Sequence, residues 1–295
     1  QAGVLLRDAT DPIEEDDPVR WNRALSKAFD VDGEPAEPSA QLYKWVSRYL
    51  DTPVKDLYET QLVVGGAKLG SFLSALEEQL ADMKTVSVRN LRESQEKPPV
   101  YETIQLNSKL SRDFLIEGTR FLAPKGDVGV KTVIKVQPTW GGLMFTAFAN
   151  MAHADDLVEV FAKTAKRAGQ YKFLKGEAFS LSGEFLTRGE ATWEDLFLPA
   201  ANLEPILRTV KTLNDNAASM ESRGIILMGP PGTGKTLAGR VMMNEAKNAT
   251  FIWCSARDFY RSGMFGGIET AYDLAAENAP SIVFIEDIDS WWSDS

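Results

Sequence analysis

The stretch Gly229-Pro-Pro-Gly-Thr-Gly-Lys-Thr236 says more than any other about how this chain folds. The apolar run at 225–228 precedes it, and a helix-like stretch that begins at Leu237 follows it. Glycines, a lysine and a threonine at this spacing form a phosphate-binding loop when they lie between a strand and a helix. The pattern arises by chance in roughly one chain in a hundred of this length. We therefore predict a strand, a loop that binds a nucleoside triphosphate, and a helix.

Each residue type in this loop has a physical role toward a triphosphate. Glycines let the backbone approach the phosphates, while successive N–H groups and the helix N-terminus supply positive potential. We expect Lys235 to reach the β- and γ-phosphates and the Thr236 hydroxyl to coordinate Mg²⁺. The residues expected to line the nucleotide site are Gly229, Pro230, Pro231, Gly232, Thr233, Gly234, Lys235, Thr236 and Leu237.

A second motif supports the first. The sequence Ser281-Ile-Val-Phe-Ile-Glu-Asp-Ile-Asp289 is a short apolar run that ends in acids. It predicts a buried parallel strand whose carboxylates lie at its C-terminal end, where ligands of α/β sheets bind. The alternative is a core strand followed by solvated acids, which the upstream loop disfavours. Glu286 and Asp287 are therefore the candidate acids of the site.

From about residue 193 to 295 the chain resembles the first half of an AAA ATPase module. The resemblance rests on the two motifs, on Thr250-Phe-Ile-Trp-Cys254 and on Asp258-Phe-Tyr-Arg-Ser-Gly-Met-Phe-Gly-Gly267. It implies an α/β fold, a P-loop NTPase core of three α/β/α layers around a parallel sheet. It also implies ATP with Mg²⁺ as ligands, ATP rather than GTP, hydrolysis by the catalytic set Lys235, Glu286 and Asp287, and a homo-hexamer that acts on protein clients.

The resemblance also says which parts to expect elsewhere. In the family, the strand with a polar sensor residue, the arginine finger and the helical lid all follow the acidic motif. We therefore expect the core to be incomplete at its C-terminus and the fragment alone to hydrolyse ATP poorly, because arginine fingers contribute about 10³ to 10⁵ in rate in related phosphoryl transfer.

The resemblance assigns a further role to Met264, Phe265 and Gly266. In the family, an aromatic-hydrophobic-Gly loop at this place grips an unfolded polypeptide in the centre of the ring. Here Met264 stands where the leading aromatic is usual, and Phe265 follows it. Met adapts to irregular surfaces, which suits a grip of low sequence preference. The alternative is that both side chains pack at a helix start.

The order of the two acids departs from the usual Asp-Glu. If the register is kept, Glu286 takes the metal role with Thr236, and Asp287 takes the role of polarising the attacking water. The base is then one methylene shorter, and misplacement of about 1 Å can cost roughly 10²-fold in rate. The reversed order, with the segment at 192–199, is most similar to the mitochondrial respiratory-complex assembly AAA chaperones and their bacterial relatives.

Composition restricts the other possibilities. The net charge of −10 disfavours nonspecific nucleic-acid binding, so we expect no specific nucleic-acid partner. Cys254 and His153 are each the only residue of their type, which excludes an intrachain disulfide and a zinc site built on two or more histidines. No run of about 18 apolar residues is present. We expect a cytoplasmic protein without a transmembrane segment in this chain.

The N-terminal two thirds carry no recognisable catalytic pattern. We interpret 1–39 as an acidic, proline-rich flexible leader, and 40–97 as a helical region with apolar stripes broken by Gly65-Gly66. The prolines at 98 and 99 predict a boundary. Residues 98–188 then read as a small α+β domain, with strands at 130–136 and 143–149, a helix at 155–168 and a hairpin at 171–186. It is a candidate for client or adaptor binding, and 189–295 is the ATPase core.

Three functions fit these observations. The first is an ATP-driven remodeller that unfolds or assembles protein clients. The second is a DNA-directed P-loop ATPase, which the acidic charge disfavours. The third is a nucleotide-gated binding module that scarcely hydrolyses ATP, which the reversed acids favour.

Overall fold

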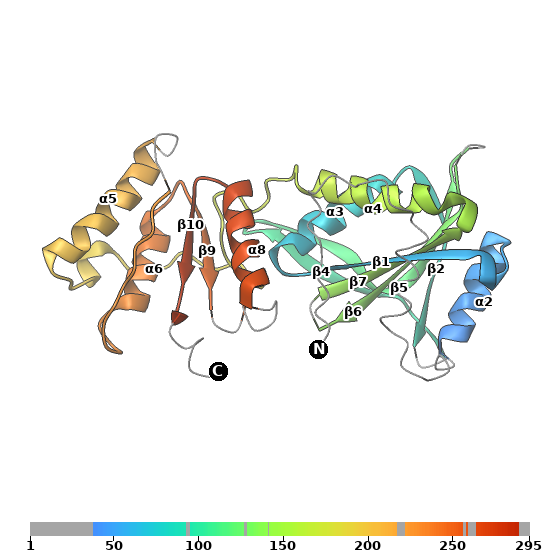
Figure 1. The fold of residues 1–295 in the computed structure, drawn as a ribbon, viewed down its shortest axis with the longest axis horizontal. Coiled ribbons are helices and arrows are strands. Elements are labelled where there is room, and N and C mark those ends of the chain that lie inside the picture. The colour runs from blue at the N-terminus through green and yellow to red at the C-terminus, as the bar shows by residue number, and fades with distance from the viewer. Residues whose placement is uncertain are drawn as a thin grey trace.

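The computed structural model describes residues 38–92, 95–126, 129–140, 142–216, 222–255, 258 and 264–288. These residues form two parts that lie end to end along the long axis of the molecule (Figure 1). The first part is a broad antiparallel sheet with helices, and the second is a smaller parallel α/β unit. The leader predicted over 1–39 lies outside the described residues, apart from its last two residues, which begin helix α2 (Pro38–Leu50).

The first part is built on a seven-stranded sheet in the order β1-β7-β6-β5-β2-β3, with β4 paired to β5. All of its strand pairs are antiparallel. Its strands are β1 (Leu57–Val64), β2 (Met83–Arg92), β3 (Gln95–Lys97), β4 (Val100–Asn107), β5 (Leu110–Pro124), β6 (Thr132–Thr139) and β7 (Gly142–Asn150). Its other helices are η1 (Val54–Asp56), η2 (Gly66–Lys68), α3 (Leu69–Leu80), η3 (Met151–His153) and α4 (Ala154–Ala168).

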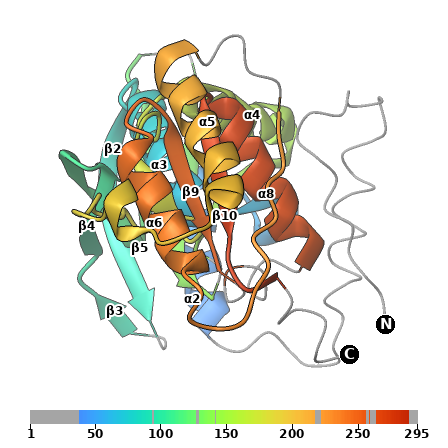
Figure 2. The ribbon, with the colours of Figure 1, turned by 90° about the vertical axis from the view of Figure 1, so that its left-hand side faces the viewer.

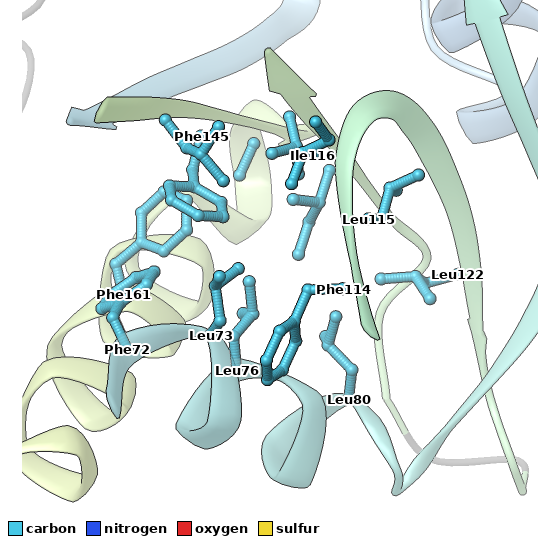
Figure 3. Close-up of a cluster of buried hydrophobic side chains, with 14 of the residues drawn as sticks. Phe72, Leu73, Leu76, Leu80, Phe114, Leu115, Ile116, Leu122, Phe145 and Phe161 are labelled. Carbon is cyan, nitrogen blue, oxygen red and sulfur yellow. The ribbon is translucent and has the colours of Figure 1, made fainter. Parts of the chain in front are cut away.

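Side-chain alternation along the strands gives this sheet two covered faces. On one face, Phe145 of β7 joins a large core under α3 and α4. Figure 3 shows how Phe72, Leu73, Leu76 and Leu80 of α3 and Phe161 of α4 meet side chains of the sheet. On the opposite face, Phe148 of β7 packs with Leu42 and Val46 of α2. A strand with alternate residues buried on both sides strongly specifies its register, because a slip by one residue exchanges the two faces.

The helical prediction for 40–97 is half right. The two apolar stripes do form helices, α2 and α3. However, β1, β2 and β3 also lie in this region, and Gly65-Gly66 separates a strand from a helix rather than two helices. The boundary predicted at the prolines of 98 and 99 falls between β3 and β4 of the same sheet. Prolines suit this turn because they have no N–H to give to a ladder.

Downstream predictions in the first part are confirmed. The strands predicted at 130–136 and 143–149 are β6 and β7, paired through a hairpin that joins Thr139 to Gly142. The helix predicted at 155–168 is α4. The segment predicted as a strand or hairpin over 171–186 contains β8 (Ala178–Ser180), which turns back at Gly183 so that Phe179 bridges to Phe185. Because β8 pairs with β9 of the second part, the predicted domain at 98–188 extends too far. Gly183 has φ +94°, a left-handed conformation that favours glycine.

The second part is a three-stranded parallel sheet in the order β10-β9-β8, covered by helices on both faces. Helix α8 (Met264–Glu277) packs on one face, and α5 (Ala200–Asn216) and α6 (Lys235–Glu245) pack on the other (Figure 1). The strands predicted at 250–254 and from 281 are β9 (Thr250–Cys254) and β10 (Ser281–Ile285), and η4 (Trp193–Asp195) precedes α5. Figure 2 shows β9 and β10 side by side with α6 on one flank and α8 on the other.

The strand predicted at 225–228 is not formed. Leu227 packs against the core under α5 and α6, whereas Ile226 and Met228 are 82% and 89% exposed. The alternation is that of a strand, but a strand also needs a hydrogen-bonded neighbour. Among the described strands β10 pairs only with β9, and this segment does not pair with the other edge of β10. The described parallel sheet is therefore smaller than the predicted three-layer core.

The two parts meet at a close backbone contact. A Cβ on Gly183 would lie 2.8 Å from the carbonyl carbon of Gly66, and Gly66 itself has φ +57°. Next to it, Ala67 packs against the core under α8, and Lys68 Nζ lies 3.0 Å from the Glu277 carboxylate. Lys172 Nζ donates to the Glu277 carbonyl at 3.0 Å. The C-terminal end of α8 is thus held against the sheet domain by two lysines.

Candidate functional site

The phosphate-binding loop has the backbone conformation that its sequence predicts. Gly232 and Gly234 have φ values of +79° and +89°, which are accessible to glycine at little cost. The Thr233 hydroxyl donates to the Pro230 carbonyl at 2.8 Å and closes the loop. Gly234 caps α6, whose first residues are Lys235, Thr236 and Leu237. The loop from Gly229 to Thr233 is exposed, so its backbone is open to a ligand.

Lys235 lies over the loop that it is predicted to serve. Its ammonium group donates to the Gly229 carbonyl at 2.8 Å and to the Pro230 carbonyl at 3.0 Å. An ammonium group has three N–H donors and rotates freely on a flexible stem. Lys235 therefore lies at the mouth of the loop with a charge suited to a phosphate oxygen.

The seating of α6 on the sheet sets the distance between the loop and the acids. Gly239 lies one turn after Thr236, and a Cβ on Gly239 would lie 2.6 Å from the ring of Phe284. The ring thus occupies the space that a side chain on Gly239 would need, which lets α6 approach β10 closely. Glu286 follows directly after β10, and its side chain lies on the same side as that of Phe284, because it contacts Thr236 of α6. This close approach brings Thr236 to Glu286.

The contact between Thr236 and Glu286 joins the two sequence motifs. The Thr236 hydroxyl donates to Glu286 Oε1, across 50 positions of sequence. The other oxygen, Glu286 Oε2, accepts from the indole Nε1 of Trp253 at 3.2 Å. The backbone of Glu286 is also fixed, because its N–H donates to the Cys254 carbonyl at 2.9 Å. The structure therefore brings the two predicted metal-binding residues together.

The donor atoms at this contact fit Mg²⁺. A hydroxyl and a carboxylate oxygen are hard ligands, and Mg²⁺ commonly takes one or two protein oxygens together with substrate phosphates and water. Within the described ranges, no group of three His, Cys, Asp or Glu side chains is arranged to hold a metal ion. A metal at Thr236 and Glu286 would therefore draw its remaining ligands from a bound nucleotide and water.

Asp287 adopts an uncommon backbone conformation immediately after β10. Its φ is +52°, in the left-handed region that few residues other than glycine enter, although Asp and Asn tolerate it best. Its side chain is exposed. Uncommon backbone conformations are often found at functional sites. The reversed order of acids thus coincides with a sharp turn of the chain, so the two carboxylates do not continue the strand alternation.

Arg188 supports the opposite end of α6 and was not foreseen from the sequence. Its guanidinium donates to the carbonyls of Met243 and Ala246 at the end of α6, and to Ala249 beyond it at 2.9 Å. A cation is favourable at a helix C-terminus, where the carbonyl dipoles point outward. Burial lowers the pKa of Arg188, an effect that the nearby Glu177 partly opposes.

The remaining single residues behave as expected or carry no site. Cys254 is buried in β9, and burial, with a smaller contribution from Asp258, raises the pKa of its thiol to about 12. His153 lies at the start of α4 with its ring 3.0 Å from the Asp156 carboxylate. Trp140, which follows β6, is 85% exposed.

The predicted pore-loop residues begin helix α8. The backbone of Met264, Phe265 and Gly266 forms its first turn. Their side chains lie outside the described part of the chain, as do residues 259–263 that precede them. Asp289, the last acid of the second motif, lies outside it as well.

Trp253 is the site residue that the sequence did not reveal. The sequence places it in a strand, but nothing in a single strand says which side chain of the neighbouring strand it will contact. The parallel register pairs Trp253 with Phe284, and this places the indole beside Glu286. Knowledge of the register was therefore the missing signal.

Comparison with known protein families supports this geometry. Residues 225–295 match the family described as "ATPase family associated with various cellular activities (AAA)". The match includes the loop, Lys235, Thr236 and the two acids. The resemblance stated from the motifs is thus confirmed at the level of the family.

Individual proteins similar to the chain come from several kingdoms. Vacuolar protein sorting-associated protein 4B of Mus musculus is 42% identical over 71 residues, 23% of this chain and 16% of that protein. Proteasome-activating nucleotidase of Methanothermobacter thermautotrophicus is 44% identical over 71 residues, 23% of this chain and 17% of that protein. ATP-dependent zinc metalloprotease FtsH of Pelodictyon phaeoclathratiforme is 30% identical over 192 residues, 60% of this chain and 27% of that protein.

The match therefore spans less than a third of the length of each of these relatives. In the part of the chain that the structure describes, no helix is both long enough and apolar enough to cross a membrane.

Proposed function

We propose that this protein binds ATP with Mg²⁺ and hydrolyses it, and that it couples hydrolysis to the remodelling, unfolding or assembly of protein clients. The observation that carries the proposal is the contact between Thr236 and Glu286 beside the Lys235 loop. Two motifs far apart in the sequence meet there in the arrangement that a phosphate and its metal require.

Binding uses the loop and the start of α6. The backbone N–H groups of residues 232–236 and the helix N-terminus attract the phosphates, and Lys235 adds a full positive charge. Thr236 and Glu286 would hold Mg²⁺, which neutralises charge that develops on the β- and γ-phosphates when it is bound. The loop recognises phosphates, so the preference for ATP over GTP rests on the AAA relationship.

Hydrolysis requires an oriented water. In the proposed reaction, Asp287 accepts a hydrogen bond from a water whose oxygen attacks the γ-phosphorus, while the bond from that phosphorus to the β–γ bridging oxygen breaks. The proton of the water passes to Asp287 or to the released phosphate. Because Asp is shorter than Glu and Asp287 lies in a left-handed turn, its position depends on the turn as well as on side-chain length.

Protein clients are favoured by the names of the relatives. One is named for activating a proteasome, one as an ATP-dependent metalloprotease and one for vacuolar protein sorting. In the proposal, the segment at Met264, Phe265 and Gly266 grips the client in the centre of a homo-hexamer. The sheet domain selects the client, and we propose that its boundary with the ATPase part lies at about 169–177, between α4 and β8.

The finer kinship we propose is with the complex-assembly AAA chaperones. It is supported by the reversed order of Glu286 and Asp287 and by the segment at 192–199, where Thr192 and Asp195 form a capping box before α5. A binding module that is gated by nucleotide but scarcely hydrolyses it is the second candidate, because the exposed Asp287 is the shorter acid.

The test is ATP turnover by the natural full-length protein beside three variants, each with and without an unfolded protein client. Lys235→Ala and Asp287→Asn should each lower turnover at least about 100-fold, the size typical for loss of one aligned electrostatic group. Phe265→Ala should keep the basal rate and lose stimulation by the client.

The outcomes separate the candidates. Turnover by the wild type no faster than by Asp287→Asn, with ATP binding intact, would favour the nucleotide-gated module and contradict hydrolysis. If a client still stimulates turnover by Phe265→Ala, the proposed pore role is contradicted, but ATP hydrolysis is not.

A further inference from the structure

Glu286 is held by a partner on each of its two carboxylate oxygens. Oε1 accepts from the Thr236 hydroxyl on α6, and Oε2 accepts from Trp253 Nε1 on β9 at 3.2 Å. The first partner belongs to the phosphate-binding motif, whereas the second belongs to neither motif. The two motifs therefore do not explain why the indole of Trp253 lies at this site.

The carboxylate of a Glu that binds a metal is harder to hold in one position than that of an Asp. Compared with Asp it has one more methylene, and so one more rotatable bond between the backbone and the carboxylate. A first-shell ligand must be held within about 0.5 Å of its working position. Hydrogen bonds from second-shell groups commonly provide this restraint. Trp253 N–H offers such a bond to the oxygen that faces away from Thr236.

The indole is itself firmly placed. Its ring centroid lies 4.7 Å from that of Phe284 and 6.0 Å from that of Phe251. Phe251 is fully buried, and Phe284 packs under Gly239 of α6. Indole Nε1–H is a donor only, so it restrains a carboxylate without competing for a cation. The same aromatic cluster thus supports α6 and aims the N–H.

We propose that Trp253 is a positioning residue that orients Glu286 for Mg²⁺ and so makes the reversed order of acids workable. The inference rests on the proposed function, since it assigns a role within the same nucleotide site. Trp253 holds Oε2, which leaves Oε1 on the side of Thr236 and the phosphates. Glu286, held at both carboxylate oxygens, then coordinates the metal as the shorter Asp does where the order is Asp-Glu.

The test is the Mg²⁺ dependence of nucleotide binding by the full-length protein. Binding of a fluorescent ATP analogue is measured over a Mg²⁺ titration, and Mn²⁺ bound with the analogue is followed by electron paramagnetic resonance. Trp253→Phe keeps a ring and removes the N–H. It should raise the half-saturating Mg²⁺ concentration by about 10- to 100-fold, the usual effect of losing a second-shell partner. Binding without metal should stay unchanged.

Phe251→Leu is the matched control. It perturbs the same aromatic cluster but removes no donor, so it should lower the thermal midpoint while the Mg²⁺ midpoint stays within twofold of wild type. If Trp253→Phe does not fold, replacement of Trp253 by β-(3-benzothienyl)alanine keeps the two-ring shape without an N–H, and the same rise is expected.

Two negative results are distinguishable. A Mg²⁺ midpoint that is unchanged in either Trp253 variant, with metal-dependent binding in the wild type, overturns the positioning role and leaves the proposed function standing. Wild-type protein that binds no nucleotide overturns the proposed function and this inference together.

Discussion

The sheet domain at 38–168 and the nucleotide part at 178–288 differ in the length of their strands and in where their exposed apolar residues lie. In the first, strands of up to 15 residues are covered on both faces, and Phe145 and Phe148 of one strand are fully buried on opposite sides. In the second, the strands have three to five residues, and Ile226 and Met228 are largely exposed. All the groups proposed for chemistry lie in the second.

This difference suggests a division of labour. Long antiparallel strands with two packed faces supply stability, because burial of apolar surface is the dominant favourable term in folding. The groups that bind phosphate must instead remain accessible, so they cannot be part of a closed core. We expect changes in one part to leave the other largely unaffected, and four variants test that expectation in order of decreasing effect.

Phe145→Ala should produce the largest loss of stability. The ring is fully buried between α3 and the sheet, and its removal should cost about 3 to 5 kcal/mol of unfolding free energy. Denaturant unfolding followed by circular dichroism measures this cost. Val63→Ala, at a site that is 55% exposed, serves as the control and should change stability by less than about 0.5 kcal/mol. Loss of ATP binding in folded Phe145→Ala would contradict the independence of the two parts.

Gly239→Ala should damage the nucleotide part instead. The new methyl would lie 2.6 Å from the Phe284 ring, so α6 must move away from β10, at a cost of about 1 to 3 kcal/mol. Because this movement separates Thr236 from Glu286, affinity for Mg²⁺–ATP should fall as well. Gly224→Ala is the matched control, since its Cβ would meet nothing within 4 Å. Equal ATP affinity in both variants would show that the packing of Gly239 against Phe284 does not affect the nucleotide site.

Cys254 should make the nucleotide part less stable in alkali. Burial raises the pKa of its thiol to about 12 from a reference of 9.0, so the unfolded chain releases this proton first as pH rises. The thiol therefore leaves the free energy of unfolding unchanged below pH 9. Between pH 9 and pH 12 it lowers this free energy, by about 1 kcal/mol at pH 10. Comparing wild type with Cys254→Ala at pH 7 and pH 10 isolates the thiol. If the free energy of unfolding changes equally in the two proteins between pH 7 and pH 10, the thiol does not cause the loss of stability.

Lys68→Glu should have the smallest effect. The pair with Glu277 joins the two parts but is exposed, at 44% and 45% of the side-chain surfaces. Exposed pairs contribute about 0 to 1 kcal/mol, and salt screens them. A double-mutant cycle with Glu277→Lys measures the coupling at low and high salt. A coupling well above 1 kcal/mol, insensitive to salt, would mean that the two parts behave as one unit.

The sequence allowed accurate prediction where the pattern was local. The loop at 229–236, the strands β9 and β10, and the helix stripes of α2, α3 and α4 each carry their own period or spacing. By contrast, none of the strands β1 to β5 is predicted. The places of β1 and β2 in the sheet, for example, depend on their pairing with β7 and β5.

The same limit applies to the site. Lys235, Thr236, Glu286 and Asp287 were found because their residue types follow fixed spacings. Trp253 was not, since its meeting with Glu286 depends on the β9–β10 register. The segment at 225–228 was expected to be a strand because its composition fits one, but strand formation also requires a neighbour. The pattern of residues in a segment indicates which secondary structure it favours, but not which other segment it will pair with.

The most direct test of the account is whether Mg²⁺–ATP stabilises the nucleotide part through Lys235. Denaturant-dependent labelling of Cys254, the single thiol of this 295-residue chain, follows the opening of β9. At an ATP concentration about 100 times the dissociation constant, the wild type should gain about 2.7 kcal/mol of protection, and Lys235→Ala should gain none. Equal protection in both proteins, or none in the wild type, would contradict a nucleotide site at this loop.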